Sequence, residues 1–311
     1  MPRLALPSRV TGIHLVSLFA HAQESDDRSP IEIDFSHLEH VTPVFLAAVP
    51  ATIERWKAGG RPVVLSGLEA CKITSYLQRM DFLDRCGVHR AEDFQRRSAS
   101  GRFVPVRPVE QPVEELAKEV AACFAPGGED FEHANAGFFD FLVYAVTEMG
   151  NNILQHSCGR GFAAVQSSRA DGMVRLALAD NGCGILKSFQ RVELPWSMGM
   201  SHEAAILKAM EPRVSCKSGE PNEGVGLTIL AHVVSQMKGW LMVASGSGMV
   251  QVTPRCEKEA MALPEGGSYE GTLVALTVRR SSAAQFGEYL HNAKIDKGLL
   301  PVAQRHATFW T

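Results

Sequence analysis

The sequence predicts an α/β protein made of two units, a small N-terminal one and a larger C-terminal one. Segments that alternate apolar and polar residues, as strands do, are interleaved with longer segments of helical periodicity. A stretch rich in Pro, Ser, Gly and Arg lies at 97–112, where we expect a boundary between the units. The length of 311 residues also exceeds the usual size of one domain.

The first unit, residues 1–100, is predicted to be a small α/β domain. The sequence IEIDF at 31–35 alternates apolar and charged residues, which predicts a strand with one covered face. The helix that follows has Thr42 as a favourable N-cap and Pro43 at its first position. Pro50 is expected to kink this helix or to delay its start. Two further elements complete the unit, a short buried strand at 61–67 and an amphipathic helix at 71–87 that ends at Gly87.

The second unit is assigned to residues 113–282, after a linker at 101–112, and a C-terminal helix and tail are assigned to 283–311. Two helices open the unit, one in VEELAKEVAACFA and a long one at 138–157. The expected strands lie at 161–167, 173–179, 239–245, 249–253 and 271–278, with a helix at about 226–238. ASGSGMVQV predicts a hairpin turn. We expect a two-layer α/β sandwich, in which helices cover one face of a mixed sheet.

Composition and charge exclude several classes of protein. The net charge of -3 argues against a nucleic-acid partner, because phosphate backbones are bound by an excess of Lys and Arg. The seven cysteines form no CxxC pair and no metal-like spacing, which indicates reduced thiols. The first 20 residues lack the continuous apolar segment of a secretion signal, so secretion is not expected, and no apolar run approaches the ~20 residues that span a bilayer. The expectation is a cytoplasmic protein with no membrane association.

The segment EMGNNILQHS at 148–157 lies at the end of an otherwise apolar helix and contains five closely spaced polar side chains before Ser157: Glu148, Asn151, Asn152, Gln155 and His156. Residues four apart share a helix face, so Glu148, Asn152 and His156 are expected to point the same way. Asn151 is expected either on the helix surface or behind the residues that contact a ligand. A solvated stripe on an amphipathic helix is the alternative interpretation of this segment alone.

Three glycine-containing segments follow in the chain. In LALADNGCGI a strand leads into Asp180, Gly182 and Gly184, a backbone that another group can approach closely. In NEGVGLTIL, Gly224 and Gly226 precede a helical run, where free N–H groups and the helix dipole favour an anion. YEGTLVALTV places Gly271 and Thr272 at the start of a late strand. The chain has no GxxxxGK[ST] motif and no third glycine of GxGxxG, so P-loop and Rossmann sites are not expected.

In this order the four segments resemble the ATP-binding domain shared by gyrase B, Hsp90, histidine kinases and MutL (the GHKL family), over roughly residues 110–280. The resemblance implies that Asp180 accepts a hydrogen bond from the adenine amino group, which favours ATP over GTP. It implies that Asn152 helps to hold Mg²⁺ and that the main chain of Gly224 and Gly226 wraps the phosphates. The remaining expected nucleotide-binding residues are Gly182, Gly184, Thr272 and His156.

The same resemblance implies a mobile lid at 186–223, in which HEAAILKAM reads as a helix. Arg213 and Lys217 could reach phosphate from this lid, although a solvated surface pair is favoured. The form AVTEMGNNILQH is most similar to the serine/threonine kinases that act as anti-sigma factors in bacterial signalling. Glu148 would then be the catalytic base. Ile153 departs from the alanine that is usual in the family.

The N-terminal unit resembles the STAS domain of anti-anti-sigma factors over roughly residues 8–98, in a degenerate form. Thr42 is the one hydroxyl where that family carries its phosphorylated serine, and a helix N-cap is the favoured role for it. The unit is expected to serve in docking or regulation.

Three functions remain open at this level: a protein kinase with ATP and Mg²⁺ as cofactors, an ATP-hydrolysing conformational switch, and a non-catalytic nucleotide-binding adaptor. The intact Glu148, Asn152 and Asp180 argue against the adaptor. The expected partner is a protein, such as a STAS-like or sigma-factor-like regulator, and a homodimer is possible.

Overall fold

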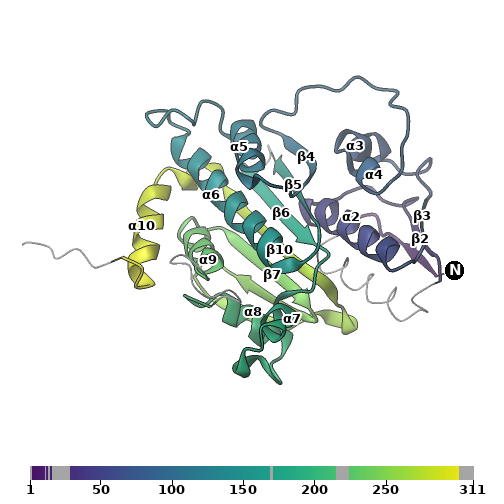
Figure 1. Cartoon of the computed structure of the whole chain (residues 1–311). Coiled ribbons are helices and arrows are strands. Elements are labelled where there is room, and N and C mark those ends of the chain that lie inside the picture. The colour runs from purple at the N-terminus through teal and green to yellow at the C-terminus, as the bar shows by residue number, and fades with distance from the viewer. Residues whose placement is uncertain are drawn as a thin grey trace, which may run out of the picture.

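The computed structural model describes residues 2–10, 12, 15, 29–168, 171–214 and 224–300 (Figure 1). It confirms the α/β fold class: the described residues form a three-stranded sheet, a seven-stranded sheet and helices packed against them. No helix in the described ranges is both long and apolar enough to cross a lipid bilayer.

The small sheet belongs to the N-terminal unit and is parallel, with the order β1-β2-β3. Its strands are β1 (Arg3–Ala5), β2 (Ile31–Asp34) and β3 (Val63–Ser66). The strand predicted to be buried, β3, is instead a half-exposed edge strand, and its Val64 is 47% exposed. The helix predicted at 71–87 is divided into α3 (Thr74–Arg79) and α4 (Phe82–Arg85), because Asp81 between them is left-handed (φ 56°).

The main helix of this unit is α2 (Pro43–Ala58), which continues through Pro50. Thr42 occupies the N-cap position as predicted, but its side chain makes no capping hydrogen bond. One side of α2 carries the small residues Ala47, Ala48 and Ala51, all fully buried. These alanines let the helix approach the large sheet closely, so the two units share one apolar core.

The large sheet has the order β4-β5-β6-β10-β7-β8-β9, and every one of its pairings is antiparallel. The mixed sheet that we expected is therefore wrong in its strand directions. Its strands are β4 (Phe103–Pro108), β5 (Gly161–Ser168), β6 (Met173–Asp180), β7 (Trp240–Gly246), β8 (Gly248–Val252), β9 (Lys258–Ala262) and β10 (Tyr269–Arg279). The predicted β7–β8 hairpin is confirmed.

Helices cover both faces of this sheet (Figure 1). The first face packs against α5 (Val113–Phe124), α6 (Ala136–Asn152), α9 (Gly226–Gln236) and the C-terminal α10 (Phe286–Asp296). The second face, which is rich in alanine, packs against α2. The expected two-layer sandwich thus acquires a third layer, because the N-terminal unit lies directly on the sheet.

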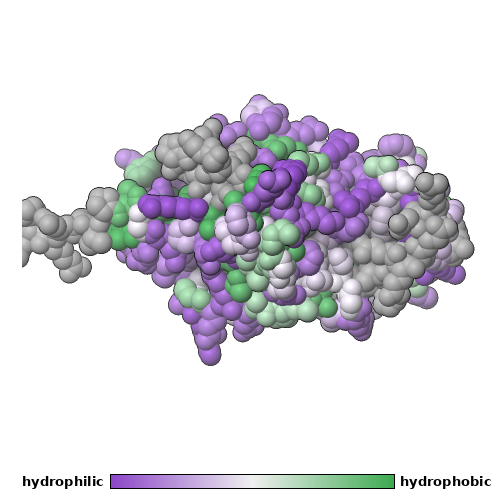
Figure 2. All heavy atoms as spheres, turned by 60° about the horizontal axis from the view of Figure 1, so that its bottom comes forward, coloured by the Kyte–Doolittle hydropathy of each residue, from purple (hydrophilic) through white to green (hydrophobic). Residues whose placement is uncertain are grey.

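The segments predicted as linker and lid both contain regular secondary structure. Within 101–112, β4 pairs with β5 as an edge strand, where Pro105 and Pro108 are tolerated. The lid segment contains α7 (Ile185–Arg191) and the predicted helix α8 (His202–Ala209), which packs against β7, β8 and β9. Figure 2 shows the side of the molecule that includes the lower edge of Figure 1, where apolar residues form small patches between hydrophilic ones.

Candidate functional site

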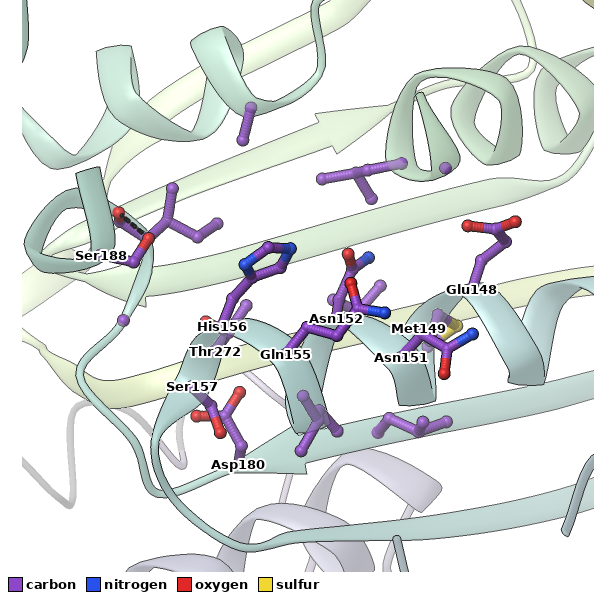
Figure 3. A pocket seen from close by; sticks show the side chains of 18 of the residues that line it. Glu148, Met149, Asn151, Asn152, Gln155, His156, Ser157, Asp180, Ser188 and Thr272 are labelled. Carbon is purple, nitrogen blue, oxygen red and sulfur yellow. Dashed lines mark hydrogen bonds between the residues drawn. The ribbon is translucent and has the colours of Figure 1, made fainter. Parts of the chain in front are cut away.

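A cavity of about 400 Å³ lies between α6, the sheet and the lid segment (Figure 3). It brings together eight of the nine residues predicted from the sequence. These are Glu148, Asn152, His156, Asp180, Gly184, Gly224, Gly226 and Thr272. The ninth, Gly182, does not line the cavity. A volume of this size suits a small-molecule ligand.

One wall of the cavity is the C-terminal part of α6 and the π-helical turn that continues it, η1 (Ile153–Ser157). Glu148, Asn152 and His156 point in the same direction from this wall, as their spacing predicts (Figure 3). Asn151 was expected on the helix surface or behind the residues that contact a ligand, but it also lines the cavity. Ile153 is the large residue where the resembled family has alanine, and Gly161 makes room for it. A Cβ added at Gly161 would lie 2.8 Å from Ile153 Cγ2.

At one end of the cavity lies the buried carboxyl group of Asp180, which is 1% exposed. The Gly182 N–H donates a hydrogen bond to its Oδ1 (2.8 Å), and Thr272 also hydrogen-bonds to the carboxyl group. Burial nevertheless raises the pKa of Asp180 to about 7, against these hydrogen bonds and the charge of Arg55. Asp180 is therefore poised to lose a proton near neutral pH when a donor enters the cavity.

At the other end lies Glu148, in the last part of α6 (Figure 3). Burial raises the pKa of Glu148, while the positive charge of Lys294 on α10 opposes that shift. Its carboxylate lies against the Cα of Gly226, where an added Cβ would overlap Oε2. A half-buried carboxylate of raised pKa is a suitable general base.

The loop after β6 is fixed against the end of η1 by backbone contacts. The Cys183 N–H donates to the Ser157 carbonyl (2.8 Å), and the Arg160 N–H donates to Asn181 Oδ1 (2.8 Å). Gly184 has a positive φ (77°) and is the N-cap of α7. These contacts fix the position of the loop that directly follows Asp180.

Gly182 allows the loop after β6 to pack closely against the backbone of Ser157. A Cβ at Gly182 would overlap the carbonyl oxygen of Ser157, which is a backbone atom without rotational freedom. We expect Gly182→Ala to lower the free energy of unfolding by about 1–3 kcal/mol, measured by urea denaturation. Gly287→Ala in α10 is the control, because an added Cβ there meets nothing within 4 Å, and it should be neutral or stabilising. Equal effects of the two substitutions would contradict the tight packing of Gly182.

Several residues that support or line the site were not predicted from the sequence. Ser245 is buried and joins the start of α7 to β10: it accepts from the Ile185 N–H (2.9 Å) and donates to the Gly271 carbonyl (2.8 Å). Tyr269 donates its hydroxyl proton to the Asp180 carbonyl (2.9 Å). Both lie in strands that read only as sheet, so no local pattern marks them. Apolar side chains complete the walls: Leu178, Ile185, Phe189, Val214, Leu227 and Val274.

The charged lid residues do not face this cavity in the described chain. Arg213 donates to the carbonyl of Gly298 at the end of α10 (3.2 Å), in agreement with a surface role. Lys217 lies outside the described residues, as does the stretch 215–223.

The donor set is compatible with a magnesium ion bound together with phosphates. Mg²⁺ takes oxygen ligands and is usually held by one or two protein groups, with phosphate and water completing its shell. Asn152 and Glu148 supply an amide and a carboxylate group within one cavity.

No family model matches this chain in comparisons with known proteins, and no curated protein matches it either.

Proposed function

We propose that the protein binds ATP with Mg²⁺ in this cavity and transfers the γ-phosphate to a protein hydroxyl. The observation that supports this most is the placement of two carboxyl groups, Asp180 and Glu148, at opposite ends of one elongated cavity. The backbone of Gly226 lies against Glu148, and Gly224 also lines the cavity. Such a cavity suits a ligand with an amine at one end and an anion near the other.

Adenine is assigned to the Asp180 end. Its amino group donates a hydrogen bond to the carboxylate, whereas the carbonyl that guanine carries at that position would be repelled. The apolar side chains Leu178 and Val274 offer the flat base a nonpolar surface. Ionised Asp180 is the form that favours adenine.

The phosphates are assigned to the Glu148 end. The N-terminus of α9 begins at Gly226, and its free N–H groups and dipole favour an anion there. Asn152 would hold Mg²⁺, whose charge offsets that of the phosphates. Glu148 takes the proton of the attacking hydroxyl, the γ-phosphoryl group passes to that oxygen, and ADP leaves.

A second candidate is an ATP-hydrolysing switch, in which Glu148 deprotonates water instead of a protein hydroxyl. The lid segment supplies Phe189, Ala209 and Val214 to the cavity wall, so a ligand contacts the lid directly and can change its position. In either case the partner is proposed to be a protein, with a STAS-like or sigma-factor-like regulator as the first candidate.

Thermal unfolding with nucleotides tests the binding proposal. ATP–Mg²⁺ should raise the melting temperature and GTP–Mg²⁺ should not, because bound ligand stabilises the folded state by mass action. Equal shifts with both nucleotides would contradict the role of Asp180.

Incubation with γ-labelled ATP and candidate partner proteins separates the two reactions. Label on a Ser or Thr of the partner supports the kinase, and release of labelled phosphate with no labelled protein supports the switch.

A further inference from the structure

Arg55, in the last turn of α2, joins the N-terminal unit to segments of the C-terminal unit that lie next to the cavity. Its guanidinium group extends from α2 to two segments of the C-terminal unit. Nε donates to Glu270 Oε2 (2.5 Å), and Nη1 donates to the carbonyls of Asn181 (2.9 Å) and Gly182 (3.1 Å). One side chain of the first unit thus bridges three acceptors of the second.

These acceptors flank the residues that define one end of the cavity. Asn181 and Gly182 directly follow Asp180, and Glu270 precedes Gly271 and Thr272. The planar fork of an arginine can bond several acceptors in fixed directions, and the bond to Glu270 is charge-assisted. Arg55 therefore holds the two segments that present Asp180 and Thr272 together.

A second contact joins α2 to the same place. The hydroxyl of Thr52, one turn before Arg55, donates to the Ala48 carbonyl (2.9 Å), and its oxygen lies near the hydroxyl of the buried Tyr269. Tyr269 in turn donates to the Asp180 carbonyl. A Cβ at Gly271 would overlap that carbonyl, so the strand and the loop lie in direct contact. Displacement of α2 would remove both supports at once.

We propose that α2 is a structural part of the nucleotide site and that Arg55 is a positioning residue that holds Asp180 and Thr272 in the arrangement that binds adenine. Nucleotide binding and the docking of the N-terminal unit on the sheet then stabilise each other, since coupling between two sites is reciprocal. This inference rests on the proposed binding of ATP.

Two variants at this position and one matched control test the inference. Arg55→Ala removes the bridge, and Arg55→Lys keeps the positive charge without the fork. Lys57→Ala is the control: Lys57 lies on the same helix and donates to the Cys86 carbonyl (2.9 Å), a contact within the N-terminal unit.

The measurements are ATP–Mg²⁺ affinity by calorimetry and hydrogen exchange at 180–184 and 269–272 without nucleotide. We expect Arg55→Ala to weaken ATP binding about tenfold and to speed exchange in both segments, with an intermediate effect for Arg55→Lys and no change for Lys57→Ala. In the wild type, ATP should slow exchange along α2. Equal affinity and equal exchange in wild type and Arg55→Ala would overturn the inference while ATP binding stands.

Absence of ATP binding by the wild type would instead overturn the proposed function. Faster exchange of the two segments in Arg55→Ala would still support the positioning role in that case, because it is measured without nucleotide.

Discussion

Replacement of Glu148 by glutamine is expected to lower turnover of ATP by about 100- to 10,000-fold and to leave ATP affinity nearly unchanged. Glutamine has the shape of glutamate but cannot accept a proton at neutral pH. Because the carboxylate lies against Gly226, an isosteric replacement should preserve the packing of α6 on α9.

Steady-state turnover and calorimetric ATP affinity, measured on the same preparation, check this result. Glu114→Gln, on the exposed side of α5, is the matched control and should change neither quantity. Unchanged turnover in Glu148→Gln would remove Glu148 from the reaction. A loss of binding equal to the loss of turnover would assign it to ground-state binding instead.

Replacement of Asp180 by asparagine should weaken ATP binding about 10- to 100-fold, because a hydrogen bond to a charged group is lost. It should also reduce the preference for ATP over GTP, since an amide can donate to the guanine carbonyl. Affinities for both nucleotides check this. Asp171→Asn is the control, because Asp171 precedes β6 at its opposite end and should not alter either affinity. Retained discrimination in Asp180→Asn would contradict the placement of adenine.

The same carboxyl group predicts how binding depends on pH. Adenine favours ionised Asp180, whose pKa is about 7 in the free protein, so ATP affinity should rise as pH increases through 7. The groups with charge effects at this site are Arg55 on α2, Tyr269 on β10 and Cys183 in the loop. Affinity measured from about pH 6 to pH 8.5 should lose this dependence in Asp180→Asn.

The free energy of unfolding should fall as pH rises, whereas ATP affinity should increase. The pKa of Asp180 is raised above its unfolded value near 3.8, so its contribution to stability is complete below that value and is lost as pH rises through about 7. Between about pH 6 and pH 8.5 the loss is about 1 kcal/mol relative to Asp180→Asn. Urea unfolding of both proteins at the two pH values measures it. The absence of any difference would contradict burial of the charge.

Local patterns in the sequence predicted the elements with strong periodicity and the residues of the cavity wall. Glu148, Asn152 and His156 could be placed together because a helix fixes their relative directions. Strands β4 and β9 were missed for a physical reason. Both lie at edges of the sheet, where prolines in β4 and charged, exposed residues in β9 replace the apolar alternation of inner strands.

Contacts between distant segments could not be read from local patterns. The division of α3 from α4 depends on the left-handed Asp81, which no glycine marks. Arg55 looks like a surface residue of an amphipathic helix, and its role follows only from the docking of α2 on the large sheet. Asn151 also lines the cavity, which its spacing from Glu148 on the helix did not predict.

A crystal structure with a non-hydrolysable ATP analogue and Mg²⁺ tests the central claim most directly. The proposal predicts the adenine amino group about 3 Å from the Asp180 carboxylate, the triphosphate between Glu148 and Gly226, and the metal ion on Asn152. An analogue bound outside this cavity, or bound with its base at the Glu148 end, would contradict the proposal.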